Sequence, residues 1–390
     1  GMINFDFYSP TKIFFGRNRE SEIGRIIKQY GFKKVLLHYG QSSIKKSGLY
    51  DRIVSSLKEQ GIAFVELGGV EPNPKVSLVR KAIQLAKAEQ VDLVLAVGGG
   101  SVIDSSKATA VGACTDEDIW RFSLHELTPQ KALPVGVILT ISAAGSELSN
   151  SCVLTNSDNW LKRGFNSDII RPLFAVMNPE LTFSVSRYQT GCGIVDIMMH
   201  TLERYFTDTS DMELASHLAE GLLKAVMEAG KKAIADPNDY EARATLMLAS
   251  SFSHNGLTGL GGKLYFTVHR LEHEISGMFD RVAHGAGLAV LFPAWAKYVY
   301  RHFTARFARF AYQVMDVSKS LTEEEAAYEG IIRLEAYFRQ IGMPVRLSEL
   351  DIDETSFEKM AEKALGQNDT LNGIIPLNKN QIIEIFEIAK

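Results

Sequence analysis

The chain has 390 residues, 46% of them hydrophobic and 23% charged, which are the proportions of a globular protein with room for two domains. Its formal net charge is −4 and it has no stripe of lysine and arginine, so nucleic-acid binding is not expected, and no apolar run reaches the length of a membrane span. Three widely spaced cysteines, Cys114, Cys152 and Cys192, form no CxxC pair, which argues against disulfides and a thiolate metal site and favours a reducing cytoplasm.

The first half of the chain alternates between apolar strands and amphipathic helices. The aromatic stretch over 5–16 alternates and predicts extended structure that ends at Gly16. Helices are then expected at 21–31, 45–60 and 76–89, and strands at 33–40, 63–69 and 91–97. Because continuous apolar strands between amphipathic helices are typical of a parallel sheet covered on both faces, these patterns predict an α/β fold.

A glycine-rich turn, Gly98-Gly99-Gly100-Ser101, directly follows the strand at 91–97 and precedes a helix. Glycines at a strand's carboxyl end let backbone amides approach a phosphate, and the N-terminus of the next helix favours its negative charge. This turn therefore predicts a pyrophosphate site, although it is not the GxGxxG pattern and a tight turn is the alternative. Ser101 and Asp104 also fit a capping box, which would make Asp104 structural.

Small and hydroxylic residues also follow the next strand. That strand, over 133–140, ends at Thr140, and the residues from Ser142 to Glu147 would lie at the same edge of the sheet. A hairpin over 151–168 and a last strand over 171–180 are expected next. Strand patterns largely stop near 186, so we expect an α/β dinucleotide-binding domain over 2–185 and an all-helical metal and catalytic domain over 186–390.

One aspartate and several histidines recur at helical spacing in the second half. Asp196 and His200 stand four apart on an apolar helix, His269 and His273 stand four apart on another, and His284 follows. A carboxylate and neutral imidazoles suit a divalent metal, and an imidazole can also move protons near pH 7. A buried Asp–His pair and surface histidines on a glycine-terminated helix are the alternatives.

Six motifs, in order over nearly the whole chain, resemble the iron-containing, or group III, alcohol dehydrogenases, and within them the butanol dehydrogenase-like, NADPH-dependent aldehyde reductases. The motifs are FYSPTKIFFG, YGQSSIKKSGLYD, VGGGSVIDSSKA, LTISAAGSELSN, GIVDIMMHTLERYF and the highly specific HRLEHEISGMFDRVAHGAGLAVLFPAW. The resemblance implies a Rossmann-like parallel-sheet domain followed by an all-helical metal-binding domain, an architecture shared with dehydroquinate synthase.

Position by position, the resemblance implies metal ligands, catalytic residues and cofactor contacts. The metal ligands would be Asp196, His200, His269 and His284. His273, beside the metal, and Asp104 are the expected catalytic residues. The cofactor-binding residues would be Gly40, Gln41, Ser42, Ser43, Gly98, Gly99, Gly100, Ser101, Asp104, Thr140, Ser142, Lys162 and Thr182. Close relatives read YGGGS around Gln41 and ATGSEMN around Ala144 and Ser149, so contacts to the ribose, nicotinamide or substrate are expected to differ here.

The resemblance implies hydride transfer between NAD(P)H and a small aliphatic aldehyde or primary alcohol, in a homodimer built through the N-terminal strands. NADP(H) is expected over NAD(H), because no carboxylate directly follows the strand at 34–39 to bind the ribose hydroxyls, while Lys45 and Lys46 lie close behind it. Fe²⁺ is the first expected metal, Zn²⁺ the next, and Ni²⁺ is possible. A dehydroquinate synthase-like lyase, a glycerol dehydrogenase-like enzyme, a metallohydrolase and a nucleotide-sensing protein without turnover are the alternatives.

Overall fold

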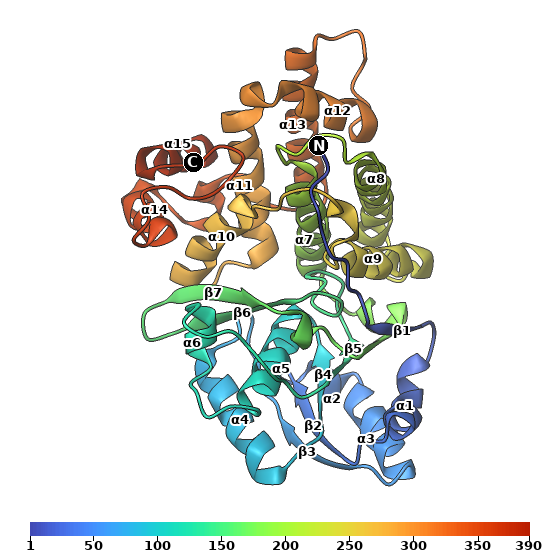
Figure 1. The fold of residues 1–390 in the computed structure, drawn as a ribbon. Coiled ribbons are helices and arrows are strands. Elements are labelled where there is room, and N and C mark those ends of the chain that lie inside the picture. Colours follow the sequence, from blue (N-terminus) through green and yellow to red (C-terminus); the bar gives the residue numbers. More distant parts are fainter. The chain divides into compact units, whose positions relative to one another are not determined.

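The computed structural model describes all 390 residues and divides the chain into two compact units. One unit is Tyr8–Ser184, and the other combines Gly1–Phe7 with Val185–Lys390 (Figure 1). The first seven residues belong to the helical unit, although the sequence predicted them as part of the α/β domain. There, the backbone N–H of Ile3 donates to the carbonyl of Gly261 over 2.9 Å.

A six-stranded, all-parallel sheet forms the centre of the α/β unit, with the order β1-β8-β5-β4-β2-β3. Its strands are β1 (Lys12–Phe15), β2 (Lys34–Tyr39), β3 (Ala63–Leu67), β4 (Leu93–Gly98), β5 (Val135–Leu139) and β8 (Phe174–Met177). The central strands are buried along nearly their whole length, as their continuous apolar sequences predict. From β2 the chain continues to β3 at one side of the sheet, and from β4 it continues to β5 in the opposite direction. The order therefore reverses between β2 and β4, where open α/β sheets bind ligands.

The helices of this unit are α1 (Ile23–Tyr30), α2 (Ser43–Lys46), α3 (Leu49–Glu59), α4 (Val76–Glu89), α5 (Gly100–Gly112) and α6 (Trp120–Ser123), with the 3-10 turns η1 (Arg19–Glu22), η2 (Asp168–Ile170) and η3 (Pro179–Thr182). The single helix expected over 45–60 is two helices, because Gly48 between them takes the left-handed φ of +83°. The predicted hairpin is confirmed: β6 (Ser151–Asn156) pairs antiparallel with β7 (Leu161–Asn166).

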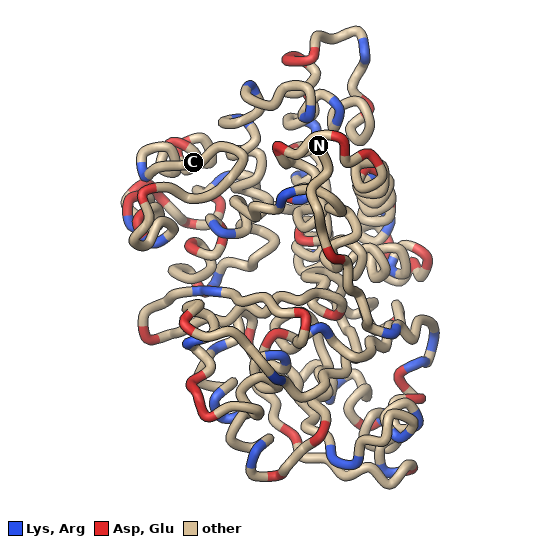
Figure 2. The backbone as a smooth tube through the Cα atoms, in the orientation of Figure 1, with Lys and Arg blue, Asp and Glu red and all other residues tan.

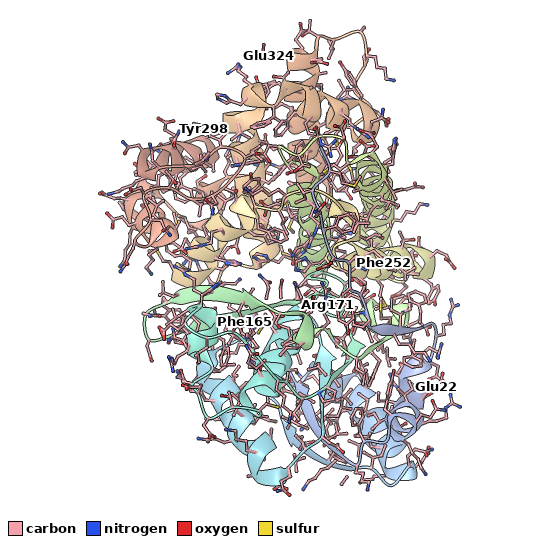
Figure 3. All side chains as sticks on the ribbon, in the orientation of Figure 1. Glu22, Phe165, Arg171, Phe252, Tyr298 and Glu324 are labelled. Atoms are coloured by element: carbon pink, nitrogen blue, oxygen red, sulfur yellow. The ribbon has the colours of Figure 1, made fainter.

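The second unit is all helical, as predicted. Its helices are α7 (Arg187–Tyr205), α8 (Glu213–Ala235), α9 (Tyr240–Phe252), α10 (Thr267–Met278), α11 (His284–Val299), α12 (Thr304–Val314), α13 (Glu323–Gln340), α14 (Phe357–Leu365) and α15 (Lys379–Ala389), with the 3-10 turns η4 (Leu257–Gly259), η5 (Tyr300–His302), η6 (Leu347–Leu350) and η7 (Glu354–Ser356). Most residues of α7 and α11 are buried, so these two helices lie in the core of the unit. Side chains fill the interior of each unit (Figure 3), and the charged residues are of mixed sign along the chain (Figure 2).

Candidate active site

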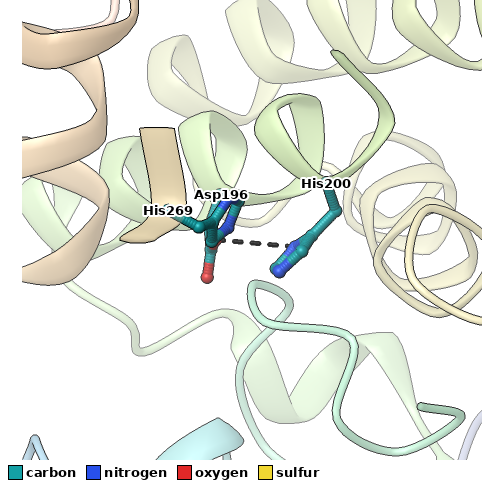
Figure 4. Close-up of side chains that lie close together, drawn as sticks. All are labelled: Asp196, His200 and His269. Atoms are coloured by element: carbon teal, nitrogen blue, oxygen red, sulfur yellow. Dashed lines mark ion pairs between the residues drawn. The ribbon is translucent and has the colours of Figure 1, made fainter. Parts of the chain in front are cut away.

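Helix α7 carries the first two predicted ligands on one face. Ser186 is the N-cap of the helix, and its Oγ accepts from the backbone N–H of Gln189 over 3.1 Å. Asp196 and His200 lie one turn apart and are buried, with exposed fractions of 4% and 5%. Figure 4 shows them beside His269, which comes from α10. Two helices far apart in the sequence thus bring three predicted ligands together.

The ligand atoms of Asp196, His200 and His269 all lie within 4.8 Å of one another. Oδ1 of Asp196 is 3.5 Å from Nδ1 of His200, from Nε2 of His269 and from Nε2 of His284, the first residue of α11. Three of these atoms, Oδ1 of Asp196, Nδ1 of His200 and Nε2 of His269, are buried without a hydrogen-bond partner. A buried polar group left unpaired costs about 1–3 kcal/mol, so three such atoms facing one another fit a bound cation. A set of imidazole nitrogens and one carboxylate suits Fe²⁺, Zn²⁺ or Ni²⁺.

The protonation states of Asp196 and His200 also fit a metal. Burial alone would raise the pKa of Asp196, but the neighbouring histidines hold it well below its usual value, so the carboxylate is ionised. Burial lowers the pKa of His200 well below its usual value, which favours the neutral ring. Burial acts in the same direction on His269, but the neighbouring carboxylates of Asp196 and Glu203 outweigh it and raise the pKa of His269.

His273 lies beside this cluster. It follows His269 by one turn of α10, is half-buried, and its ring centroid is 6.1 Å from that of His284. Neither His273 nor His284 belongs to the group of three ligand atoms that lie within 4.8 Å of one another, but Nε2 of His284 lies 3.5 Å from Oδ1 of Asp196. The role of His273 in moving a proton stays a prediction.

Four further residues lie near the cluster, and three of them, Glu203, Glu272 and His254, were not found from the sequence. Glu203 and Glu272 accept hydrogen bonds from Nδ1 of His269 and of His284, respectively. The ring of His254 stacks on His200 at a centroid distance of 3.8 Å, and Phe266 lies edge-on to His269 at 5.1 Å. Phe266 takes the left-handed φ of 52°, which is rare for an aromatic residue. No local pattern marks Glu203, Glu272 or His254, because each contacts a residue 12 to 66 positions away.

The glycine-rich turn lies where the sequence placed it, at the carboxyl end of β4. Gly98 ends the strand, Gly99 is the N-cap of α5, and no side chain caps this helix. A Cβ on Gly99 would lie 2.1 Å from Cγ2 of Ile141, and one on Gly100 would lie 2.6 Å from Cβ of Ala144. The turn thus combines free N–H groups at a helix N-terminus with glycines that the loop after β5 closely covers.

Asp104 does not form the capping box that its spacing from Ser101 suggested. The helix already begins at Gly100, and the Asp104 carboxylate instead accepts from Oγ of Ser146 over 2.6 Å and from the N–H of Val153 over 3.1 Å. The capping box was wrong because the first turn starts two residues earlier than a box with Ser101 as N-cap requires. Asp104 joins α5 to the loop after β5 and to β6.

The other predicted cofactor residues follow neighbouring strands. Gly40, Gln41, Ser42 and Ser43 come after β2, Thr140 and Ser142 after β5, and Thr182 is in η3 after β8. Because all strands are parallel, these positions lie at one edge of the sheet. Lys162 instead comes from β7, where its Nζ donates to Oδ1 of Asn73 over 2.9 Å. The hydroxyl of Thr182 donates to the carbonyl of Pro179, while the buried hydroxyl of Ser142 has no partner. Their contacts to a cofactor stay predictions.

Lys107 is a further buried residue that the sequence did not single out. Its Nζ lies within hydrogen-bonding distance, 2.7–3.2 Å, of the carbonyl and hydroxyl oxygens of Ser146 and Ser149 and of the carbonyl oxygen of Ser151. Burial lowers the pKa of Lys107 to about 8. Through these contacts α5 fixes the loop that covers Gly99 and Gly100. Ser149, one of the departures from close relatives, contributes its hydroxyl to this network.

The first unit is typical of nucleotide-binding proteins, because its parallel sheet carries a glycine-rich, uncapped helix N-terminus at the switch point. The buried Asp–His set of the second unit is typical of a metal site. The two features together describe an enzyme that uses a dinucleotide and a metal. Two family models match the chain, "Iron-containing alcohol dehydrogenase" over residues 10–179 and "Fe-containing alcohol dehydrogenase family, C-terminal" over residues 190–390. The chain belongs to the iron-containing alcohol dehydrogenase family, which confirms the resemblance.

Individual relatives agree with this assignment. NADH-dependent butanol dehydrogenase A of Clostridium acetobutylicum is 41% identical over 99% of both chains. The NADPH-dependent aldehyde reductase YqhD of Escherichia coli is 32% identical over 93% of both chains. The crystal structure of NADH-dependent butanol dehydrogenase A from Thermotoga maritima superposes with a TM-score of 0.96 at 40% identity, covering 100% of this chain and 99% of the other.

The protein is thus an oxidoreductase, a metal-dependent alcohol dehydrogenase or aldehyde reductase that uses NAD(P) and a divalent metal. The predicted fold and reaction class are confirmed, and the lyase, hydrolase and sensor alternatives are set aside. None of its helices combines the length and the apolar character that crossing a membrane requires.

Proposed function

We propose that the enzyme interconverts small aliphatic aldehydes and primary alcohols, with Asp196, His200, His269 and His284 holding one divalent cation. The observation that carries the proposal is that the buried, unpaired atoms Nδ1 of His200 and Nε2 of His269 converge on Oδ1 of Asp196. Nε2 of His284 lies at the same distance of 3.5 Å from this oxygen. A cation bound there acts as a Lewis acid toward the oxygen of the aldehyde or alcohol. Fe²⁺ is our first choice, Zn²⁺ the second, and Ni²⁺ a possible replacement. The names of the butanol dehydrogenase and aldehyde reductase relatives support the substrate class.

We assign proton handling to His273. Its half-buried ring lies beside the ligand cluster, and an imidazole can hold or release a proton near pH 7. In the direction of aldehyde reduction, His273 would supply the proton that the alcohol oxygen needs, and in the other direction it would accept it. Asp104, also predicted as catalytic, acts in this proposal by holding Ser146 and the start of β6.

For the cofactor, we propose that the pyrophosphate binds the N–H groups of Gly98–Ser101 and that NADP(H) is used in preference to NAD(H). Residues 40–46 contain no carboxylate, and Glu66, on the neighbouring β3, accepts hydrogen bonds from the hydroxyls of Tyr39 and Tyr50. Nζ of Lys45 lies over the rings of the same two tyrosines, at 5.5 and 4.9 Å. Lys45 thus offers a positive charge after β2, while the carboxylate of Glu66 is engaged by the two tyrosine hydroxyls, and this arrangement favours a 2′-phosphate on the ribose. The relatives' names include both NADH-dependent and NADPH-dependent enzymes, so the ratio of kcat/KM for the two cofactors is the test.

We further propose that the enzyme is a cytoplasmic homodimer. All three cysteines are free thiols, which suits a reducing compartment. Ile3, Phe5 and Phe7 are 45–49% exposed at alternating positions of the N-terminal segment, and a second copy of the chain would cover them. The molar mass in solution of the intact chain and of an Ile3→Ser/Phe5→Ser variant tests this assembly.

The decisive experiment follows the absorbance of NADPH and of NADH with C3 to C6 aldehydes, with and without a chelator. We expect oxidation of the cofactor that stops with the chelator and returns with Fe²⁺ or Zn²⁺. His200→Ala should lose both metal and turnover, whereas His273→Ala should keep the metal and change the pH profile of kcat. His302→Ala, at an exposed position, is the control. A His200→Ala protein with full metal and activity would disprove the ligand set, and no metal-dependent oxidation with any aldehyde would disprove the reaction.

A further inference from the structure

We infer that Glu203 and Glu272 are positioning residues of the metal site, each fixing the tautomer and orientation of one ligand histidine and so setting the affinity for the cation. The inference rests on the proposed ligand set. Both carboxylates are buried, with exposed fractions of 7% and 0%. Neither glutamate is one of the four predicted metal ligands.

Glu203 lies one helical turn past His200 on α7 and binds the start of α10 in three ways. Its carboxylate accepts from Nδ1–H of His269 and from the backbone N–H groups of Val268 and His269, over 2.7 and 2.8 Å. The N-cap of α10 is Phe266, whose side chain cannot accept a hydrogen bond. Glu203 therefore caps the N-terminus of α10 in place of the N-cap side chain, and its negative charge is stabilised by the positive end of the helix dipole.

The bond to Nδ1 decides which nitrogen of His269 is free. Because Nδ1 carries the hydrogen that Glu203 accepts, Nε2 keeps its lone pair, and this is the atom that lies 3.5 Å from Oδ1 of Asp196. The backbone bonds hold the same carboxylate in place, so the ring cannot turn without losing them. Glu203 thus prepares His269 as a ligand before any cation binds.

Glu272 does the same for His284 from a different direction. It lies on α10, three residues after His269, and accepts from Nδ1 of His284 and from the hydroxyl of Ser276. Nε2 of His284 is left to face Asp196 at 3.5 Å. A Cβ on Gly287 would lie 2.4 Å from Oε2 of Glu272, so this glycine makes room for the carboxylate. The second glycine of the motif HGAG is thereby explained by the position of Glu272.

The two pairs share one arrangement, in which a buried carboxylate binds Nδ1 and leaves Nε2 for the cation. Carboxylates in this position raise the basicity of the imidazole, and their loss typically weakens metal binding about 10–100-fold. His200 differs, since its unpaired Nδ1 is the atom that faces Asp196. We therefore expect His269 and His284, and not His200, to depend on a carboxylate partner.

The test measures metal affinity directly. Zn²⁺ dissociation constants would be determined by competition with a chromophoric chelator for the wild type, Glu203→Gln and Glu272→Gln, changes that remove the charge and keep the shape. Each variant should bind Zn²⁺ about 10–100-fold more weakly, and Glu203→Asp should recover part of the loss. Glu220→Gln is the matched control, because Glu220 is as buried but binds Tyr205 and Arg309.

A double variant separates this role from a general effect on folding. If Glu203 acts through His269, then adding Glu203→Gln to a His269→Ala protein should weaken Zn²⁺ binding by less than a factor of about two. The absorption spectrum of bound Co²⁺ should also change in the single Gln variants and stay unchanged in Glu220→Gln. Wild-type affinity and spectrum in both Gln variants, while His200→Ala loses the metal, would overturn this inference alone. Retention of metal by His200→Ala would instead overturn the proposed ligand set on which it rests.

Discussion

His38 provides a test of how the cofactor edge of the sheet is held together. The residue is fully buried near the end of β2, where Nδ1–H donates to the carbonyl of Leu67 on β3 and Nε2 accepts from Oγ of Ser105 on α5, each over 2.7 Å. It thus joins the strand before Gly40 to the helix after Gly100. Burial, only partly opposed by the bond to Leu67, lowers the pKa of His38 from 6.5 to about 4.

The folded protein therefore needs the neutral ring, whereas the unfolded chain takes up a proton below about pH 6.5. Between pH 6.5 and 4 the unfolded state binds more protons, so the stability contribution is complete above this window and is lost as the pH falls through it. At about 1.4 kcal/mol per pH unit over the window from pH 6.5 to about 4, the full loss is about 3 kcal/mol, and most of it falls between pH 7 and pH 4.5.

The assay compares wild type with His38→Asn, which keeps a donor for Leu67 and does not titrate in this range. Urea unfolding at constant ionic strength and with chelator present should show a free energy of unfolding that falls more steeply with decreasing pH in the wild type. The advantage of the wild type should shrink by about 2–3 kcal/mol between pH 7 and pH 4.5. His302→Asn, at an exposed position, controls for the loss of a histidine. Parallel pH profiles of the wild type and His38→Asn would refute the reasoning.

Two further substitutions test the loop that covers the glycine-rich turn. Lys107→Met removes a buried ammonium that lies near five oxygens and should lower the free energy of urea unfolding by about 3–5 kcal/mol. Lys87→Met, the control, removes an exposed bond to the carbonyl of Thr115 and should change this free energy by less than about 0.5 kcal/mol. Equal midpoints of urea unfolding in the two variants would contradict this prediction. Gly100→Ala would place a Cβ 2.6 Å from that of Ala144 and should raise the cofactor dissociation constant at least about tenfold in a fluorescence titration. Gly221→Ala, where nothing lies within 4 Å, should leave it unchanged, and an equal constant in Gly100→Ala would show that the turn tolerates the contact.

Local patterns determined much of this protein. Continuous apolar strands and 3.6-residue periodicity predicted the parallel sheet and the helical second half, because both depend on neighbours a few residues apart. Asp196 and His200 were found in the same way, since four-residue spacing places them on one helix face, and the structure shows them together. The glycine-rich turn was found because its position after a strand has a direct physical meaning.

Other features were decided only by the tertiary structure, because they join residues with no regular separation along the chain. Glu203 meets His269 across 66 positions, and Lys107 meets Ser149 across 42, so no helical or strand period could reveal either contact. The N-terminal segment belongs to the helical unit through contacts such as that of Ile3 with Gly261. Gly287 appeared only as part of a motif in the sequence, and the packing of Glu272 against it supplied the reason. Local spacing thus marked the candidate residues of the metal site, the resemblance to a known family selected the expected ligands among them, and long-range packing supplied the carboxylates that bind two of those ligands.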